Sequence, residues 1–390
     1  MTAAMPIITD TESLAAFCSR LEKSAFITVD TEFMREKTYY PKLCVIQLAS
    51  EDEALAVDAM AEDIDLSPLL DLMANEKVLK VFHAARQDLE IFYHLMGKLP
   101  APLFDSQVAA MVCGFGESVG YETLVKKLAG AVIDKSSRFT DWAHRPLTDR
   151  QIKYALADVT HLRTIYEKLS KSLGKNARYE WLGEELAKLT DEKIYQFPPR
   201  EAWRRVKSRG PKPRFLAILR EVAAWREEEA QRKDIPRNRI LRDEALSEIA
   251  HHVPKSVQDL SRTRGLGKRM AEGSAGKAIL KAVAAGLDVP KDECPQVQRK
   301  PHLPRGIGPV TDILKVLLKM KCEEHEVAQK LVAGGDDVEK IAAYGDKAEV
   351  AALHGWRQHI FGNDALLVRD GKVALVVEKQ RLELVEFEED

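Results

Sequence analysis

Hydrophobic residues in the first half of the chain follow two alternating patterns. Short runs rich in Val, Ile and Leu predict β-strands over Phe26–Phe33, Leu43–Ala49, Ala54–Asp58 and Val78–His83. Apolar residues at helical spacing predict helices over Thr11–Leu21, Leu66–Ala74, Ala84–Met96 and Ser106–Cys113. Three closely spaced strands followed by strand–helix units predict a mixed sheet flanked by helices, which is an α/β fold.

The clearest helix is predicted over Asp149–Ser170. Its apolar positions keep the helical period throughout and are Ile152, Ala155, Leu156, Val159, Leu162 and Tyr166. A stripe of this kind predicts that one face of the helix is buried against the sheet.

The pattern changes after Gln196, where proline and glycine interrupt the chain before a strongly amphipathic helix over Phe215–Lys233. Prolines at 290, 295, 301, 304 and 309 predict a linker. Residues 310–360 again read as helical, and Asp370-Gly371 between two apolar runs, Ala365–Arg369 and Val373–Glu378, predicts a hairpin. We expect four segments: a sheet domain over 1–200, a helical domain over 208–288, a linker over 289–304 and a second helical domain with the hairpin over 305–390.

Composition and cysteine usage narrow the class of protein. A chain of 390 residues suits two or three domains, and its 45% hydrophobic and 31% charged residues are typical of globular proteins. No apolar run approaches the roughly 20 residues of a membrane helix, and the first residues carry no secretory pattern. The five scattered cysteines form no CxxC pair, so neither a disulfide framework nor a zinc site is expected. A cytoplasmic protein is the simplest interpretation.

The net charge of −2 hides an uneven distribution. Residues 201–290 carry 20 Lys+Arg against 12 Asp+Glu, a local charge of +8, whereas the rest of the chain carries −10. A basic middle region with acidic flanks is typical of a surface that contacts a polyanion. A solvated helical surface with a chance asymmetry is the alternative.

Four acids and one tyrosine stand at spacings that suggest chemistry. Asp30 and Glu32 are two apart on a predicted strand, so both point to one face. Asp88 shares a helix face with apolar residues, and Tyr154 lies one helical turn before Asp158. Taken singly, each has an ordinary explanation: an exposed acidic strand edge, an acid favoured at a helix start, or a core tyrosine beside a stray acid.

Taken together, the five residues resemble the DEDD exonuclease superfamily in its tyrosine subclass, and most closely the ribonuclease D family. The supporting segments are Phe82-His-Ala84, Asp88-Leu89, Asp134-Lys-Ser, Thr140-Asp-Trp142, Arg145-Pro-Leu, Gln151, Tyr154-Ala and Ala157-Asp-Val159. The likeness covers residues 7–170. In the histidine subclass a histidine stands where this chain has Lys153, so the resemblance is to the tyrosine subclass.

The resemblance implies a ribonuclease H-like fold and two divalent ions, Mg²⁺ or Mn²⁺, held by Asp30, Glu32, Asp88 and Asp158. Carboxylate oxygens suit these hard cations, which activate water for an in-line displacement. By the same resemblance Asp30 bridges both ions, Glu32 also holds the terminal 3′-hydroxyl, and Tyr154 orients the attacking water. Flanking residues expected to bind nucleic acid are Phe33 and Met34 by stacking, and Lys135 and Arg138 through phosphates. His83 and Trp142 are expected to be core residues.

Residues 211–286 resemble an HRDC domain, a helical module that ribonuclease D shares with certain helicases. The matching positions include Leu219-Arg220, Trp225-Arg226, Asp234-Ile-Pro236 and Ile240-Leu-Arg-Asp243. Basic residues near its predicted turns are candidates for phosphate contact, namely Arg262, Arg264, Lys268 and Arg269. Residues 305–390 resemble a divergent second copy anchored by Gly355-Trp-Arg357, whose acidic end suits bracing the catalytic domain better than holding RNA.

The resemblance implies a monomeric 3′→5′ exoribonuclease that trims 3′ ends of transfer-RNA precursors and other structured RNAs and releases 5′-mononucleotides. Two alternatives stay open at this point. A DNA 3′→5′ exonuclease uses the same catalytic set, and a non-catalytic RNA-binding scaffold is possible on the same fold. The HRDC-like modules and the intact set of five residues favour the exoribonuclease.

Overall fold

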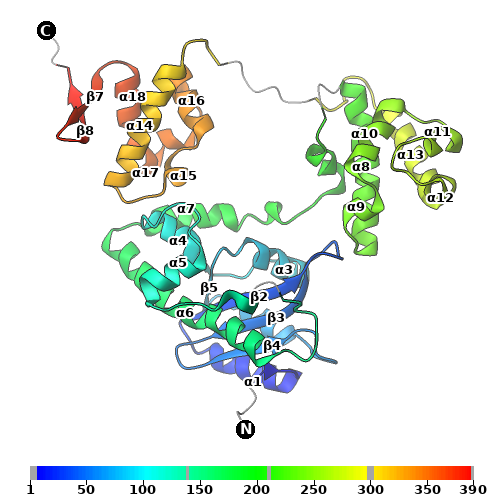
Figure 1. Ribbon diagram of the computed structural model, residues 1–390, viewed down its shortest axis with the longest axis horizontal. Coiled ribbons are helices and arrows are strands. Elements are labelled where there is room, and N and C mark those ends of the chain that lie inside the picture. The colour runs from blue at the N-terminus through cyan, green and yellow to red at the C-terminus, as the bar shows by residue number, and fades with distance from the viewer. Residues whose placement is uncertain (1–6, 138–139, 209–211, 297–302, 388–390) are drawn as a thin grey trace.

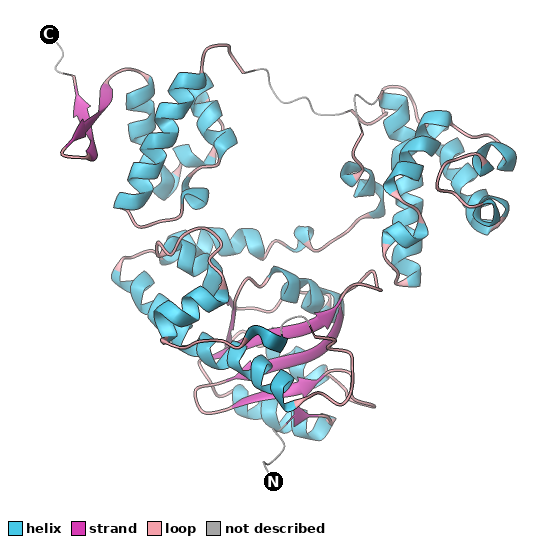
Figure 2. Ribbon diagram, in the orientation of Figure 1, coloured by secondary structure: helices cyan, strands magenta, loops and turns pink. Residues whose placement is uncertain are grey.

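The computed structural model describes residues 7–137, 140–208, 212–296 and 303–387. Its main sheet has six strands in the order β1-β4-β3-β2-β5-β6 (Figure 2). The strands are β1 (Ile7–Ile8), β2 (Phe26–Met34), β3 (Lys42–Ala49), β4 (Ala54–Asp58), β5 (Leu79–Phe82) and β6 (Leu103–Asp105). The pairs β2–β3 and β3–β4 are antiparallel and the other three are parallel, which confirms the mixed sheet.

Helices cover both faces of this sheet. One face packs against α1 (Thr11–Leu21), α2 (Ser67–Ala74) and α3 (Arg86–Met96), and the other against the long α6 (Asp149–Lys175). Because side chains alternate along a strand, Ile27 and Val29 of β2 enter the core under α1 to α3. Thr28 and Asp30 consequently point to the α6 face.

The helical domain that follows is built on α8 (Pro213–Lys233). Its other helices are α9 (Arg237–Ile240), α10 (Asp243–His252), α11 (Val257–Ser261), α12 (Lys268–Glu272) and α13 (Ser274–Asp288). At Gly286 of α13 a Cβ atom would lie 2.5 Å from Cα of Ile218 in α8. Only glycine therefore allows the two helices to pack so closely.

The last helical region packs directly on the sheet domain (Figure 1). It contains α14 (Gly308–Glu324), α15 (Gln329–Val332), α16 (Gly335–Tyr344), α17 (Gly355–Arg357) and α18 (Asn363–Arg369). One continuous hydrophobic cluster joins these helices to α4 (Ser106–Val112), α6 and α7 (Tyr179–Leu189). The predicted domain boundaries stay predictions, but this shared cluster makes the C-terminal region part of the same packed body as the six-stranded sheet.

Two sequence predictions need correction. Ala365–Arg369 is not a strand but lies within helix α18, and the hairpin is formed by β7 (Val373–Glu378) and β8 (Arg381–Glu386). Gly371, with φ of 74°, follows the helix end, where glycine is the favoured residue. The turn itself falls at Lys379 and Gln380, both with positive φ. Asp370-Gly371 was therefore a helix stop and not a hairpin turn.

Among the residues that the structure describes, no helix is both long and apolar enough to cross a membrane.

Candidate active site

Strand β2 presents the first two candidate acids at the end of the sheet. Asp30 pairs with Gln47 and Glu32 with Val45 of the neighbouring β3, and the register shifts between Glu32 and Phe33. A bulge of this kind redirects the strand and ends regular pairing. It follows directly after the two acids, and only Phe33 and Met34 of β2 pair with β3 beyond it.

Helix α6 presents Tyr154 and Asp158 to the same place. A capping box between Thr148 and Gln151 defines the start of this helix. The Thr28 hydroxyl of β2 donates to the carbonyl of Val159 at 2.8 Å, and the Tyr121 hydroxyl donates to the carbonyl of Asp158. These two bonds hold the part of α6 around Asp158 in position over β2, the strand that carries Asp30.

The two elements bring three carboxylates together. Asp30, Glu32 and Asp158 each offer an oxygen, and these three atoms lie within 4.8 Å of one another. Burial, and next the nearby Asp158, raise the pKa of Asp30 well above its usual range. Such a cluster is unfavourable unless a cation compensates the charge, so these residues fit a divalent metal with oxygen ligands.

Asp88 is buried beside this cluster in the first turn of α3. It is 7% exposed, and the Thr31 hydroxyl donates to its Oδ1. Burial is the first cause that raises the pKa of Asp88, and the charge of Asp30 is the second. Asp88 is therefore an electrostatic neighbour of Asp30 but is not in the group of three acids.

The turn before α3 is held by Asp105 at the end of β6. Its carboxylate accepts the amides of Ala84 at 3.2 Å and Ala85 at 2.8 Å, and it also caps α4. Ala84 has a φ of 57°, a conformation that a non-glycine residue rarely adopts without such support. Asp105 thereby places the start of α3, and with it Asp88.

The acids open onto a cavity of 810 Å³, a size typical of small-ligand sites. The candidate site residues on its lining are Asp30, Glu32, Phe33, Met34, Tyr154 and Asp158. Further lining residues include Glu36, Lys37, His83, Gln87, Tyr121, Thr140, Asp141 and Trp142. The two aromatic residues Phe33 and Tyr154 thus share a cavity with the acids.

His83 and Trp142 were predicted to be core residues. Trp142 is in the core, 3% exposed in a hydrophobic cluster with Ile152 and Ala155, whereas His83 is half-buried, and both also line the cavity. His83 Nδ1 lies 2.9 Å from the Ser106 hydroxyl, and its ring centroid lies 5.3 Å from that of Tyr121. Burial lowers the pKa of His83, which favours a neutral imidazole. The Phe82-His-Ala84 motif was a signal for His83, whereas nothing in the local sequence marks Tyr121.

The predicted nucleic-acid-binding residues are dispersed. Arg138 lies outside the described residues, and for Lys135 only the backbone of a short 3₁₀ turn is described. The four basic residues of the helical domain are exposed on the α11–α12 turn and on α12, and are Arg262, Arg264, Lys268 and Arg269. Figure 1 shows α12 on the outer side of that domain. The structure does not bring them to the cavity.

Comparison with known proteins agrees with this geometry. Residues 5–174 match the family model described as "3'-5' exonuclease", and residues 215–283 match the HRDC domain. The chain is 50% identical to ribonuclease D of Nitrobacter hamburgensis, covering 98% of this chain and 100% of that protein. It is 48% identical to ribonuclease D of Acidiphilium cryptum, with 98% and 97% covered.

A solved structure gives the same result. RNase D of Escherichia coli, described as an exoribonuclease involved in structured RNA processing, superposes with a TM-score of 0.79 at 29% identity. The match covers 94% of this chain and 99% of the E. coli chain, so the likeness includes all the helical regions as well as the sheet. The chain is therefore an exoribonuclease that belongs to the ribonuclease D family.

Proposed function

We propose that this enzyme hydrolyses phosphodiester bonds at RNA 3′ ends with two divalent metal ions, Mg²⁺ or Mn²⁺. The observation that carries the proposal is the group of three carboxylate oxygens within 4.8 Å beside a buried fourth acid. Asp30, Glu32 and Asp158 would hold one ion, and Asp30 with Asp88 the other. Bound there, divalent ions supply Lewis-acid activation of water and stabilisation of the leaving oxygen.

The remaining roles belong to the chain itself. Tyr154 lines the cavity one helical turn from Asp158, a position suited to orienting water through its hydroxyl. A phenol with a pKa near 10 is a weak base at neutral pH, so its contribution is orientation first and proton transfer second. Phe33 and Met34 would offer apolar faces on which any terminal base can stack, and Glu32 would accept a bond from the 3′-hydroxyl.

We further propose that the substrates are transfer-RNA precursors and other structured RNAs, shortened to 5′-mononucleotides. The family and the relative involved in structured RNA processing support this class. The basic Arg262, Arg264, Lys268 and Arg269 are proposed as phosphate contacts away from the cavity, and Lys135 and Arg138 as further phosphate contacts. A cytoplasmic monomer fits the five cysteines, none of which forms a disulfide.

The test is a time course on a 5′-labelled single-stranded RNA with Mg²⁺, with Mn²⁺ and with EDTA, beside the Asp30→Asn variant. We expect a ladder that shortens from the 3′ end and disappears with EDTA and with the variant. Equal shortening of DNA of the same sequence would favour a DNA exonuclease, because only RNA offers 2′-hydroxyls. A ladder unaffected by EDTA and by Asp30→Asn would refute the proposed site, and binding with no ladder would indicate a scaffold.

A further inference from the structure

The loop between β2 and β3 has one side on the cavity and the other on the HRDC domain. Residues 35–41 begin directly after the strand that carries Asp30 and Glu32. Within this loop Glu36 and Lys37 line the cavity and are exposed. Tyr39, only two residues further, is buried as a member of the hydrophobic core of the HRDC domain. Only Thr38 separates the buried Tyr39 from Lys37 at the cavity rim, so the position of Tyr39 restricts that of Lys37.

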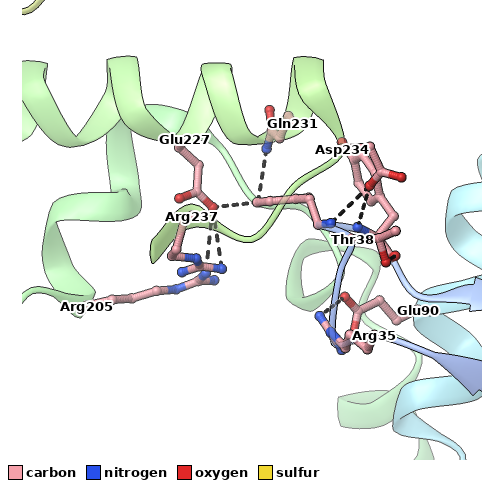
Figure 3. Close-up of polar contacts among 10 residues, drawn as sticks. Arg35, Thr38, Glu90, Arg205, Glu227, Gln231, Asp234 and Arg237 are labelled. Carbon is pink, nitrogen blue, oxygen red and sulfur yellow. Dashed lines mark hydrogen bonds and ion pairs between the residues drawn. The ribbon is translucent and has the colours of Figure 1, made fainter. Parts of the chain in front are cut away.

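The buried side of the loop is held by the end of α8. Asp234 Oδ1 accepts the backbone amides of Tyr39 and Tyr40, both at 3.0 Å. Figure 3 draws these two bonds as dashed lines that end at Asp234. Asp234 follows the last residue of α8 and has a φ of 48°. Its carboxylate can reach back over the loop only because the chain turns out of the helix there.

A second set of contacts surrounds the Tyr39 ring. Its hydroxyl donates to Glu227 and accepts from Gln231 at 3.2 Å. Glu227 is 1% exposed, and its Oε1 lies 3.6 Å from Arg237 and 4.0 Å from Arg205 (Figure 3). The Tyr39 hydroxyl thus bonds to a buried carboxyl group that also lies beside two guanidinium groups. The Tyr39 side chain is thereby fixed in one place.

The rest of the loop is held by the catalytic domain. Arg35 forms two bonds to Glu90 of α3, at 2.8 and 2.6 Å, and the Tyr40 ring stacks on His94 with centroids 4.0 Å apart. Between these contacts lies Lys37, which is exposed and lines the cavity, so its positive charge lies at the cavity rim. A 3′ end that enters the cavity must carry its phosphate chain past this rim.

We propose that Asp234 and Tyr39 are positioning residues for RNA hydrolysis: through them the HRDC domain holds Lys37 at the cavity rim, where it binds a phosphate of the incoming strand. The proposal rests on the catalytic cavity assigned above. It gives the HRDC domain a role in substrate binding that needs no contact between that domain and the RNA.

Steady-state kinetics on a single-stranded oligoribonucleotide test the proposal. Asp234→Gly keeps a residue that tolerates positive φ but removes the acceptor, whereas Asp234→Asn keeps an acceptor oxygen at the same place. We expect Asp234→Gly to raise KM about tenfold, the size of one charge-assisted hydrogen bond, with kcat kept within about twofold. Asp234→Asn should restore the wild-type KM, and Tyr39→Phe should raise KM less than Asp234→Gly because the amide bonds remain.

A double-mutant cycle separates positioning from simple destabilisation. If Asp234 acts through Lys37, then Asp234→Gly combined with Lys37→Ala should give no higher KM than Lys37→Ala alone, although the two side chains lie in different domains. Additive effects on KM, or an unchanged KM in Asp234→Gly, would overturn the proposal. All variants are assayed at a temperature at which circular dichroism shows them folded.

Limited trypsin digestion gives a readout independent of catalysis. The bond after Lys37 should be cut faster in Asp234→Gly than in wild type or Asp234→Asn, because the loop has lost its anchor. Equal rates in all three proteins would contradict the anchoring. RNA hydrolysis by the Asp30→Asn variant would refute the assigned catalytic site and not the anchoring. The KM ratios and the digestion rates would still test whether Asp234 anchors the loop.

Discussion

The carboxyl group of Asp30 is under two unfavourable influences, burial and the neighbouring Asp158. Both favour the protonated form in the folded protein, whereas the unfolded chain ionises at about pH 3.9. The folded state therefore binds more protons than the unfolded state between that value and the raised folded pKa. By linkage, the contribution of Asp30 to stability without metal is fully present at low pH and is lost as pH rises through this interval.

This sign leads to a prediction for Asp30→Asn. In EDTA at neutral pH the variant should be at least as stable as the wild type, and its stability should fall less as the pH rises above about 3.9, where the unfolded carboxyl ionises. Mn²⁺ should raise the melting temperature of the wild type but not that of the variant, because binding to the folded state stabilises it by mass action. Urea unfolding and thermal melts measure both effects.

The matched control is Asp52→Asn, a substitution of the same chemistry at an exposed position. It should follow the wild type in every condition. A variant Asp30→Asn that is clearly less stable than wild type in EDTA would show that repulsion among the acids is not a significant cost.

Tyr154→Phe should separate water orientation from metal binding. Loss of the hydroxyl should lower kcat by about 10²-fold, in the range of a positioned acid–base group. The Mn²⁺-induced rise in melting temperature should stay at the wild-type level, because the tyrosine is not expected to be a ligand. A rise reduced to that of Asp30→Asn would instead make the phenol part of the metal site.

The local sequence pointed to the acids and Tyr154 as candidates, but not to Tyr121. Acids at strand and helix spacings leave a visible pattern. Residues two apart on a strand, or four apart on a helix, point to the same face of that element. Tyr121 matters because its hydroxyl binds the carbonyl of Asp158, 37 residues later. No local pattern records such a contact, and the same holds for Tyr39 and Asp234, which are 195 residues apart.

At the scale of elements, one ion pair holds the segment before α6 on the sheet. Arg145 binds both oxygens of Asp58 in β4 at 2.6 Å, and it also donates to the carbonyl of Cys44 in β3 at 3.0 Å. Asp58 is 6% exposed. The segment thus fixed includes Trp142, which lines the catalytic cavity.

Arg145→Leu should therefore destabilise the protein by about 2–3 kcal/mol, since a buried carboxylate is left without its partner. Adding Asp58→Asn should recover part of this loss, because the amide carries no charge while its oxygen still accepts the Met60 amide. Urea denaturation measures the three free energies of unfolding. A double variant less stable than Arg145→Leu would contradict this explanation, because the unpaired charge of Asp58 would then not be the cause of the lost stability.

Periodicity predicted the longer elements well, and its failures have local causes. Strands β1 and β6 have two and three residues, too few for any alternation to be visible. They form because neighbouring strands supply their hydrogen bonds. The hairpin was placed wrongly since Asp-Gly is favoured both in hairpin turns and after helix ends, and only the packing of α18 on α14 decides between them.

For the whole molecule, the two helical regions are attached in different ways. The C-terminal region shares a hydrophobic cluster with α4 and α7. Arg178 donates to the carbonyls of His325 and Glu326 across the junction and to that of Val112 on its own side. Trp181 and Trp356 stack with centroids 4.3 Å apart. The HRDC domain instead receives Tyr39 into its own core. The first attachment gives a rigid brace, whereas the second rests on one loop.

The basic residues of the HRDC domain can be tested through salt. Reversal of Arg262 and Arg264 to Glu should weaken RNA binding several-fold and lower the slope of log K against log salt by about 0.7 for each lost phosphate contact. Reversal of Lys77 and Lys98, two exposed lysines of the catalytic domain, changes the net charge equally. If both double variants lose the same affinity and slope, the effect is one of net charge and the HRDC surface has no special part.

The size of the cavity limits what can reach the acids. A volume of 810 Å³ admits the end of a single strand, whereas a duplex is wider than any small-ligand pocket. An RNA whose 3′ end is closed in a stable hairpin should therefore be shortened far more slowly than the same RNA with a single-stranded 3′ tail. On the tailed RNA, digestion should stop a few nucleotides before the duplex, at a distance set by the rim that includes Lys37. Gel analysis of 5′-labelled RNAs resolves these end points. Equal rates on the closed and the tailed RNA would require the enzyme to open duplexes itself, and the cavity alone would then not select the substrate.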